Sequence, residues 1–203
     1  NEWNIADENV AGIGIKSNLK YHNPDQFKFL KYITLTGSEY SGKVLISGFN
    51  IPLISKNKLK DVDWLQGGLS SWKLEHVPSI FNRNYPLVKW SILEDLIFSF
   101  HIKKVKKFKL QMSNGLKAFV IQSTLKNYNV SEFFYRGYEY GRMHKVFVYQ
   151  NKNELSKIAF FYSYITTSVL GILWCSLKFN RKLFFYVGRL NGICANVKKI
   201  KVL

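Results

Sequence analysis

Cysteine and acidic residues are scarce in this chain of 203 residues. Cys175 and Cys194 are the only cysteines, and their separation excludes Cys-x-x-Cys zinc and redox motifs, so we expect a reducing compartment. Thirteen Asp and Glu stand against 30 Lys and Arg, which gives a formal net charge of +17. A positive field of this size favours anionic partners such as nucleotide diphosphates, polyanionic glycans, acidic lipids or nucleic acid.

Several motifs are absent as well. The sequence has no zinc-finger spacing, no RNP-like run and no basic-region zipper, so we predict no nucleic-acid partner, although charge alone gives non-specific affinity. It has no internal repeat, no low-complexity tract and no N-terminal signal pattern, and it starts with Asn1 rather than Met. We therefore expect a processed chain, an expression product or a fragment of a longer protein.

Apolar residues make up 47% of the chain and aromatic residues 16%, which predicts a folded core. The most informative stretch runs from Ser91 to Lys104. Ser91 and Glu94 have the spacing of a capping box, which predicts that Ser91 caps a helix. Apolar side chains recur in it at i, i+3, i+4 and i+7 and predict one core-facing helix face: Leu93, Leu96, Ile97 and Phe100.

The two carboxylates of this predicted helix, Glu94 and Asp95, have two interpretations. In the structural one they stabilise the positive end of the helix dipole, while Lys103 and Lys104 stabilise the negative end. In the functional one they form a catalytic pair. The stretch by itself leaves both interpretations open.

The segment Asp63-Trp-Leu-Gln-Gly-Gly68 lies some thirty residues upstream. Paired glycines let a backbone turn tightly, and they let a ligand lie against the main chain because no Cβ is in the way. An ordinary turn with Trp64 in the core is the alternative interpretation.

The remaining segments of the first part are assigned by pattern. Strands are predicted at 10–15, 43–47 and 117–121, and over 103–110 alternating basic and apolar residues predict another, with a solvated or phosphate-binding basic face. Helices are predicted from Leu69, capped by Ser70 or Ser71, and from Ser131 toward Met143. We also predict a turn at 23–26 and a loop at 78–86 that is a candidate acceptor lid.

The C-terminal part contains a long uncharged run, Ile158 to Leu177. Twenty helical residues would be about 30 Å long, the thickness of the hydrocarbon layer of a bilayer. Its Ser, Thr and Tyr residues leave a buried or interfacial helix open beside a spanning one. Basic residues flank the run on both sides, which favours an interfacial anchor or hairpin at an acidic membrane: Lys157, Lys178, Arg181 and Lys182.

The order and spacing of these motifs resemble the second half of the family 2 glycosyltransferases. The resemblance rests on the Trp64-Leu-x-Gly-Gly68 run, on the Glu94-Asp95 pair at a helix start, on the strand Val10 to Ile15 and on the aromatic, Arg-containing segment Phe134 to Arg142. It implies an α/β fold of the GT-A type, a mixed sheet with flanking helices. Residues 1–128 would be the acceptor-side half of the catalytic domain and residues 129–203 a helical, membrane-associated tail.

The resemblance also implies site residues for an inverting transferase of glycan or glycolipid biosynthesis. Asp95 would be the catalytic base and Glu94 would orient it or hydrogen-bond the acceptor. The pocket floor would be formed by Trp64, Gln66, Gly67 and Gly68. Phosphate or membrane contacts are predicted for three cations of the aromatic segment: Arg136, Arg142 and Lys145.

A divalent metal, Mg²⁺ or Mn²⁺, is expected for a complete enzyme of this family, held by an Asp-x-Asp motif. The early acids Glu2, Asp7 and Glu8 do not form that motif, and Gln122 and Ser123 stand where relatives often place a metal-binding His. His144 stands alone. We therefore predict no metal ligand in this chain and expect it to be inactive without a nucleotide-binding half.

The expected partners are a nucleotide sugar, a glycan or lipid-linked acceptor and a membrane surface, with the protein at the cytoplasmic face. The alternative is a non-enzymatic basic module that binds anionic membranes or polyanions and in which the Glu94-Asp95 helix is purely structural.

Overall fold

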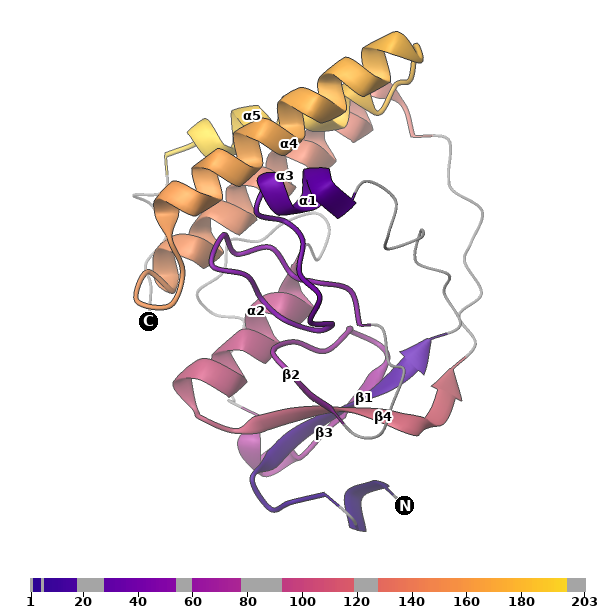
Figure 1. The fold of residues 1–203 in the computed structure, drawn as a ribbon, viewed down its shortest axis with the longest axis vertical. Coiled ribbons are helices and arrows are strands. Elements are labelled where there is room, and N and C mark those ends of the chain that lie inside the picture. The colour runs from indigo at the N-terminus through magenta and orange to yellow at the C-terminus, as the bar shows by residue number, and fades with distance from the viewer. Residues whose placement is uncertain are drawn as a thin grey trace.

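One mixed sheet of four strands lies at one end of the molecule (Figure 1). The computed structural model describes residues 2–4, 6–17, 28–53, 60–77, 93–118 and 128–196. Within these ranges the strand order is β2-β4-β1-β3, with β1 and β4 parallel and both outer strands antiparallel to their neighbours. The strands are β1 (Val10–Ser17), β2 (Lys60–Val62), β3 (Ser70–Trp72) and β4 (Lys109–Ala118). The predicted α/β class is confirmed.

Three long helices form a layer at the other end, and α2 lies between them and the sheet (Figure 1). The described α-helices are α1 (Lys28–Ile33), α2 (Glu94–Phe100), α3 (Val130–Gln150), α4 (Lys157–Leu177) and α5 (Leu183–Cys194). Shorter helical turns are η1 (Glu2–Asn4), η2 (Leu74–His76) and η3 (His101–Val105), the last a π-helical continuation of α2.

Two glycines of β1 lie under side chains from neighbouring segments. A Cβ on Gly12 would come within 2.7 Å of the Trp72 ring, and one on Gly14 within 2.8 Å of Leu65. Side chains of the protein itself therefore close over one face of β1.

The core-facing side of α2 is confirmed, but its predicted cap is wrong. Leu96, Ile97 and Phe100 are buried, and Leu93 packs against the same core. The helix begins at Glu94 with Leu93 as N-cap residue, in a left-handed conformation (φ 62°) and without a side-chain cap. The Leu93 carbonyl accepts the first helical hydrogen bond from Ile97 N–H, so Ser91, which lies outside the described residues, is not the N-cap.

Three predicted elements differ from the structure because tertiary pairing overrides the local pattern. Residues 43–47 form a loop with a single bridge, Val44 to Asn50, in place of a strand. Residues 70–72 become β3 rather than a helix because their backbone pairs with β1. Residues 103–105 continue α2, where Lys103 and Lys104 reach carboxylates of other segments, so β4 begins only at Lys109.

Helices predicted in the C-terminal part are present with shifted boundaries. Asn129 caps α3 in place of Ser131: its side chain accepts from Glu132 N–H, and the Glu132 carboxylate accepts from Asn129 N–H, a complete capping box. The uncharged run forms α4, long and apolar enough to cross a membrane. Of the predicted strand at 117–121, residues 117 and 118 belong to β4 and the rest lie outside the described residues, as do the predicted turn at 23–26 and loop at 78–86.

One hydrophobic core joins the sheet to the helical layer. Phe100 of α2 packs edge-on against Phe147 of α3, with ring centroids 5.1 Å apart. Leu155, Phe160 and Ile193 belong to the same cluster as the strand residues. The cluster therefore contains residues from both sides of the predicted boundary near residue 128.

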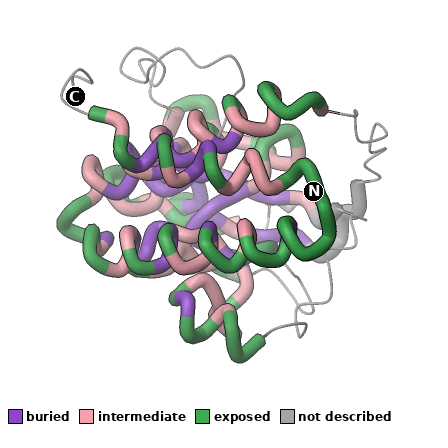
Figure 2. Tube along the Cα trace, turned by 90° about the horizontal axis from the view of Figure 1, so that it is seen from above, coloured by how far each residue is buried: buried purple, intermediate pink, exposed green. Residues whose placement is uncertain are grey.

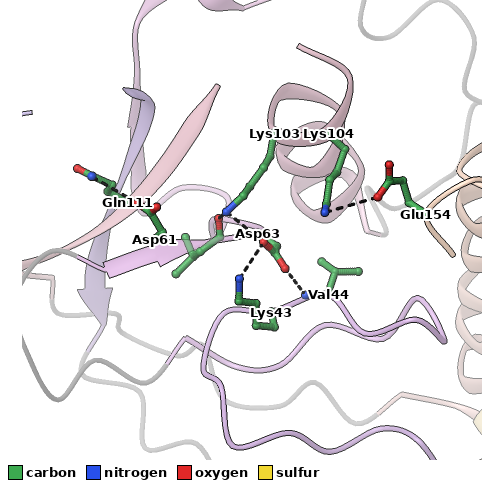
Figure 3. A network of polar contacts seen from close by, with 9 residues as sticks. Lys43, Val44, Asp61, Asp63, Lys103, Lys104, Gln111 and Glu154 are labelled. Carbon is green, nitrogen blue, oxygen red and sulfur yellow. Dashed lines mark hydrogen bonds and ion pairs between the residues drawn. The ribbon is translucent and has the colours of Figure 1, made fainter. Parts of the chain in front are cut away.

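A network around Asp63 holds the chain just before the Trp64-Leu-Gln-Gly-Gly68 run (Figure 3). Its carboxylate accepts from Val44 N–H at 3.1 Å and pairs with Lys103 at 3.1 Å and Lys43 at 3.5 Å. Lys103 also donates to the Val62 carbonyl at 2.6 Å. Burial by itself raises the pKa of Asp63, but the Val44 N–H and the two ammonium groups outweigh it and lower that pKa below its ordinary value.

We expect Asp63→Asn to lower the free energy of unfolding by about 2 kcal/mol at neutral pH, because two ammonium groups lose their partner. The lowered pKa of Asp63 means that this stabilisation is present above the ordinary Asp pKa and is lost as the pH falls through the folded-state value. Urea unfolding at neutral and acidic pH measures both effects. Asp61→Asn, at an exposed carboxylate on β2, is the control; equal losses in the two variants would contradict the prediction.

Candidate active site

A hollow of about 260 Å³ lies between the start of α2 and the segment that leads into β3. Two carboxylates and two aromatic rings border it, together with main chain from the glycine turn. The lining residues are Leu65, Gly67, Ser70, Trp72, Glu94, Asp95 and Phe98. Its volume is just below the usual range for small-molecule pockets, about 300–1,000 Å³.

Asp95 is fastened to the glycine turn by a direct hydrogen bond. Gly67 N–H donates to Asp95 Oδ2 at 3.1 Å, and Leu96 N–H donates to Asp95 Oδ1 at 3.0 Å. Each carboxylate oxygen has a second lone pair that these bonds do not use. The carboxylate is partly exposed, so these lone pairs can face the hollow. The carboxylate is thus held in a defined orientation at the rim.

A second bond one helical turn later repeats this arrangement. Leu65 N–H donates to the Ser99 hydroxyl at 3.0 Å, and both residues are buried. Asp95 and Ser99 are four residues apart and lie on one face of α2, so the helix binds alternate N–H groups of the loop. This pair of bonds fixes the loop relative to the carboxylates.

The glycines of the turn differ in what they contribute. A Cβ on Gly67 would lie 3.4 Å from Cβ of Asp95, which is ordinary van der Waals contact, so the hydrogen bond to Asp95 does not depend on a glycine here. Gly68 has open space around it but a φ of +73°, which a side chain would strain. Leu69 N–H donates to the Gln66 carbonyl at 3.2 Å and closes the turn.

Two aromatic residues form the apolar side of the hollow. Trp72 and Phe98 pack edge-to-face with ring centroids 4.6 Å apart, and Trp72 Nε1 donates to the Ser70 hydroxyl at 3.0 Å. A rigid apolar surface opposite oriented carboxylates suits a ligand with both apolar and hydroxyl faces.

Backbone strain occurs at the residue before the carboxylate pair. Leu93 has a left-handed φ of 62°, a conformation that costs a non-glycine residue about 1–2 kcal/mol. Packing of the buried face of α2 holds Leu93 in this conformation, and the conformation sets the direction in which the side chains of Glu94 and Asp95 point.

The structure brings together some of the predicted site residues and separates others. Asp95, Glu94 and Gly67 border the hollow, while Gly68 and Gln66 belong to the same turn but are not among the lining residues. Trp64 is in the core, where its Nε1 donates to the Ile51 carbonyl at 2.9 Å, so its predicted place in the pocket floor is taken by Trp72. The alternative interpretation of Trp64 as a core residue describes it better.

The three cations predicted for phosphate or membrane contact lie on α3, outside the lining of the hollow. Arg136 stacks over Tyr128 at 4.4 Å, and Arg142 forms an ion pair with Glu139. Lys145 donates to the carbonyls of Ile193 and Ala195 and caps the end of α5. Each has a structural partner within the helical layer.

Four lining residues have no counterpart in the predicted site: Leu65, Ser70, Trp72 and Phe98. For Phe98 the signal was present, since it follows Asp95 by one helical turn. Ser70 and Trp72 were not predicted as lining residues because their segment was assigned to a helix. Side chains two residues apart point to the same side only in a strand.

No group of three His, Cys, Asp or Glu side chains converges on a metal position within the described ranges. Asp95 and Glu94 provide two carboxylates without a third ligand. The described residues therefore do not form the metal site that the family resemblance implies for a complete enzyme.

His144 is buried among aromatic rings of α3, α4 and the 41–50 loop. Its Nε2–H donates to the Gly48 carbonyl at 2.8 Å, and Nδ1 has no hydrogen-bond partner among the residues that the structure describes. Burial lowers the pKa of His144 to about 3, against a smaller raising effect of the Gly48 bond. The imidazole is neutral at physiological pH and has a packing role.

We expect the free energy of unfolding to fall by about 2 kcal/mol between pH 7 and pH 5 because of His144. Its folded-state pKa of about 3 lies below that of the unfolded chain, so the stabilisation is present above about pH 6.5 and lost as the pH falls. Urea unfolding of the protein and of His144→Gln across this range is the measurement. Identical pH slopes for the two proteins would contradict the prediction.

Comparison of the chain with protein-family models, with curated proteins and with solved structures gives no match in any of the three.

Proposed function

We propose that this chain forms the acceptor side of an inverting glycosyltransferase with a GT-A-like fold. A nucleotide-binding segment would supply the donor half, and the chain alone would be inactive. The observation that carries the proposal is the Asp95 carboxylate, oriented by Gly67 N–H at the rim of a hollow that Glu94 and Trp72 also border.

The proposed chemistry requires a positioned base. An acceptor hydroxyl has a pKa far above neutrality, so it attacks the anomeric carbon only as a carboxylate takes up its proton. Asp95 would accept that proton while the new glycosidic bond forms. The bond between the anomeric carbon and the phosphate oxygen breaks at the same time, and the nucleoside diphosphate leaves with the electron pair.

The other residues of the hollow would position the acceptor. Glu94 offers a second carboxylate for a hydrogen bond to another acceptor hydroxyl, and the Trp72 ring offers an apolar surface for its carbon face. Acceptors of this kind are glycans or lipid-linked sugars. The leaving diphosphate needs charge compensation, which Mg²⁺ or Mn²⁺ bound by the donor half would supply.

The test is the Asp95→Asn exchange in an enzyme that contains a donor half, with transfer from a nucleotide sugar as the readout. The proposal requires loss of turnover while the acceptor is still bound. Unchanged turnover would remove Asp95 from the role of base.

A second candidate function is a non-enzymatic module at an anionic membrane. The long apolar helix α4 and the net charge of +17 favour it. In either case we place the protein at the cytoplasmic face of a membrane. Sugar transfer that depends on Asp95 would reject the non-enzymatic candidate.

A further inference from the structure

The outer face of α4 carries an apolar stripe along its whole length. Buried residues of the three long helices gather between them, and exposed residues follow their outer sides (Figure 2). On α4 these exposed positions are mainly large and apolar. They are Ile158, Tyr162, Ile165, Val169, Leu170, Leu173, Trp174 and Leu177.

The stripe ends in a strained and fully exposed aromatic residue, Phe179. Its N–H donates to the Ser176 carbonyl and the Asn180 N–H to the Cys175 carbonyl, the two bonds of a Schellman motif. Phe179 is at the left-handed position of that motif (φ 48°), where glycine is preferred, and it is 97% exposed. No contact within the described structure compensates for either feature, so the exposed ring is suited to an external apolar surface.

The charged residues at the two ends of α4 in the sequence are cations. Lys157 is the first residue of α4, Lys178, Arg181 and Lys182 follow the helix, and the sequence has no Asp or Glu after Glu154. The Lys178 ammonium lies 4.1 Å from the Trp174 ring, which places an aromatic–cation pair at the C-terminal end of the stripe. An apolar strip with cations at both ends is complementary to an anionic lipid surface.

The inner face of α4 carries buried polar residues where it packs on the helical layer. Ser163, Tyr164 and Ser168 are buried, and the buried Arg189 guanidinium of α5 lies 4.1 Å from the Tyr164 ring. Arg189 Nη2 also donates to the Thr167 hydroxyl at 3.4 Å. If α4 moved into hydrocarbon as a spanning helix and carried Arg189 with it, the guanidinium would enter the lipid at high cost. If α4 moved alone, Arg189 would lose its contacts with Tyr164 and Thr167.

We propose that α4 lies flat in the interface of an anionic bilayer, with its apolar stripe toward the acyl chains and Phe179 inserted, and does not cross the membrane. This inference rests on the membrane association proposed above and is independent of glycosyl transfer. The partner is the lipid surface itself, recognised by apolar burial and by phosphate contacts of the flanking cations.

Phe179→Gly distinguishes a loss of membrane binding from a folding defect, because we expect it to weaken binding and to raise the stability of the protein. Glycine relieves the left-handed strain, so the melting temperature should rise. It also removes the inserted ring, so partitioning onto vesicles of phosphatidylcholine with about one third phosphatidylglycerol should fall about tenfold. Loss of binding in a more stable protein cannot be a folding defect.

The experiment is co-sedimentation of the full chain with these vesicles and with pure phosphatidylcholine vesicles. Leu74→Ser is the matched control: Leu74 is 86% exposed on η2, which follows β3 at the end of the molecule away from α4 (Figure 1). We expect the control to bind like the unchanged protein, and binding to weaken on pure phosphatidylcholine and in high salt.

Three outcomes would overturn the inference. Equal vesicle binding by Phe179→Gly and the unchanged protein would show that the membrane association does not use this tip. Protein that resists extraction from the vesicles by alkaline carbonate would show a spanning helix. Absence of vesicle binding, with Phe179-dependent self-association in analytical ultracentrifugation, would assign the stripe to a second copy of the chain.

Discussion

Replacing Asp95 by Asn lowers kcat for glycosyl transfer by about 10²- to 10⁴-fold in an enzyme that contains this chain and a donor-binding half. An amide oxygen can still accept the hydrogen bond from Gly67 N–H, which is 3.1 Å from Asp95 Oδ2. The local geometry is therefore kept, while the group that takes up the acceptor proton is lost. KM for the acceptor should change by no more than about threefold, because ground-state binding is retained.

Asp61→Asn is the control for this measurement. It removes an exposed carboxylate of β2, outside the hollow, with the same chemical change, and it should leave kcat unchanged. Initial rates of nucleoside diphosphate release, measured over a range of acceptor concentrations, separate kcat from KM. A fall in kcat of equal size in both variants, or a rise in acceptor KM alone, would reject Asp95 as the base.

Gly188→Ala lowers the free energy of unfolding by about 3 kcal/mol or more. A methyl group there would lie far inside van der Waals contact with the Phe134 carbonyl of α3 and 2.9 Å from Tyr138 N. The clash is with helix backbone, which cannot turn aside as a side chain can. In an isolated helix the same exchange would stabilise by about 1 kcal/mol, so the packing reverses the sign.

The contact is reciprocal along the two helices. Gly137 and Gly141 of α3 face the backbone of α5 at Phe185 and Arg189, while Gly192 of α5 faces Tyr138. Each helix thus presents two glycines four residues apart, and the backbones approach as closely as in the Gly-x-x-x-Gly pairs of membrane helices. These contacts connect α5 to the core through α3.

Gly171→Ala provides the comparison for Gly188→Ala. The three atoms nearest to a methyl group on Gly171 of α4 all belong to the Tyr186 ring, a side chain that can move more easily than helix backbone, so the loss should be clearly smaller. Urea unfolding of both variants, followed by far-UV circular dichroism, gives the two values. A Gly188→Ala protein as stable as the unchanged one would show that α3 and α5 can separate without cost to the core.

Apolar periodicity predicted the long elements well. The spacing of Leu96, Ile97 and Phe100 identified the buried face of α2, and the uncharged run identified α4 to within one residue. Both succeed because a helix needs only local hydrogen bonds, and its buried face repeats along the sequence. Helix starts were less well predicted because capping depends on one residue, as with Asn129 in place of Ser131.

Short strands and the pocket lining were predicted less well. Ser70, Ser71 and Trp72 have a sequence that suits the start of a helix, yet they form β3 because the edge of β1 offers hydrogen-bond partners. Trp64 and Trp72 are both tryptophans near the glycine turn, and nothing local distinguishes the core residue from the pocket residue.

The sequence alone determined the α/β class, the apolar face of α2 and the long apolar helix with cations at its ends. It also suggested, as a hypothesis, that the Glu94-Asp95 pair lies close to the glycine turn. Only the tertiary structure decided that Gly67 N–H binds the Asp95 carboxylate, that Trp72 borders the hollow and that glycines join α3 to α5. The physical reason is the separation in sequence of the residues involved. Periodicity and charge are local properties of the chain. The tertiary contacts join segments far apart in sequence, and whether those segments meet depends on the packing of the whole core.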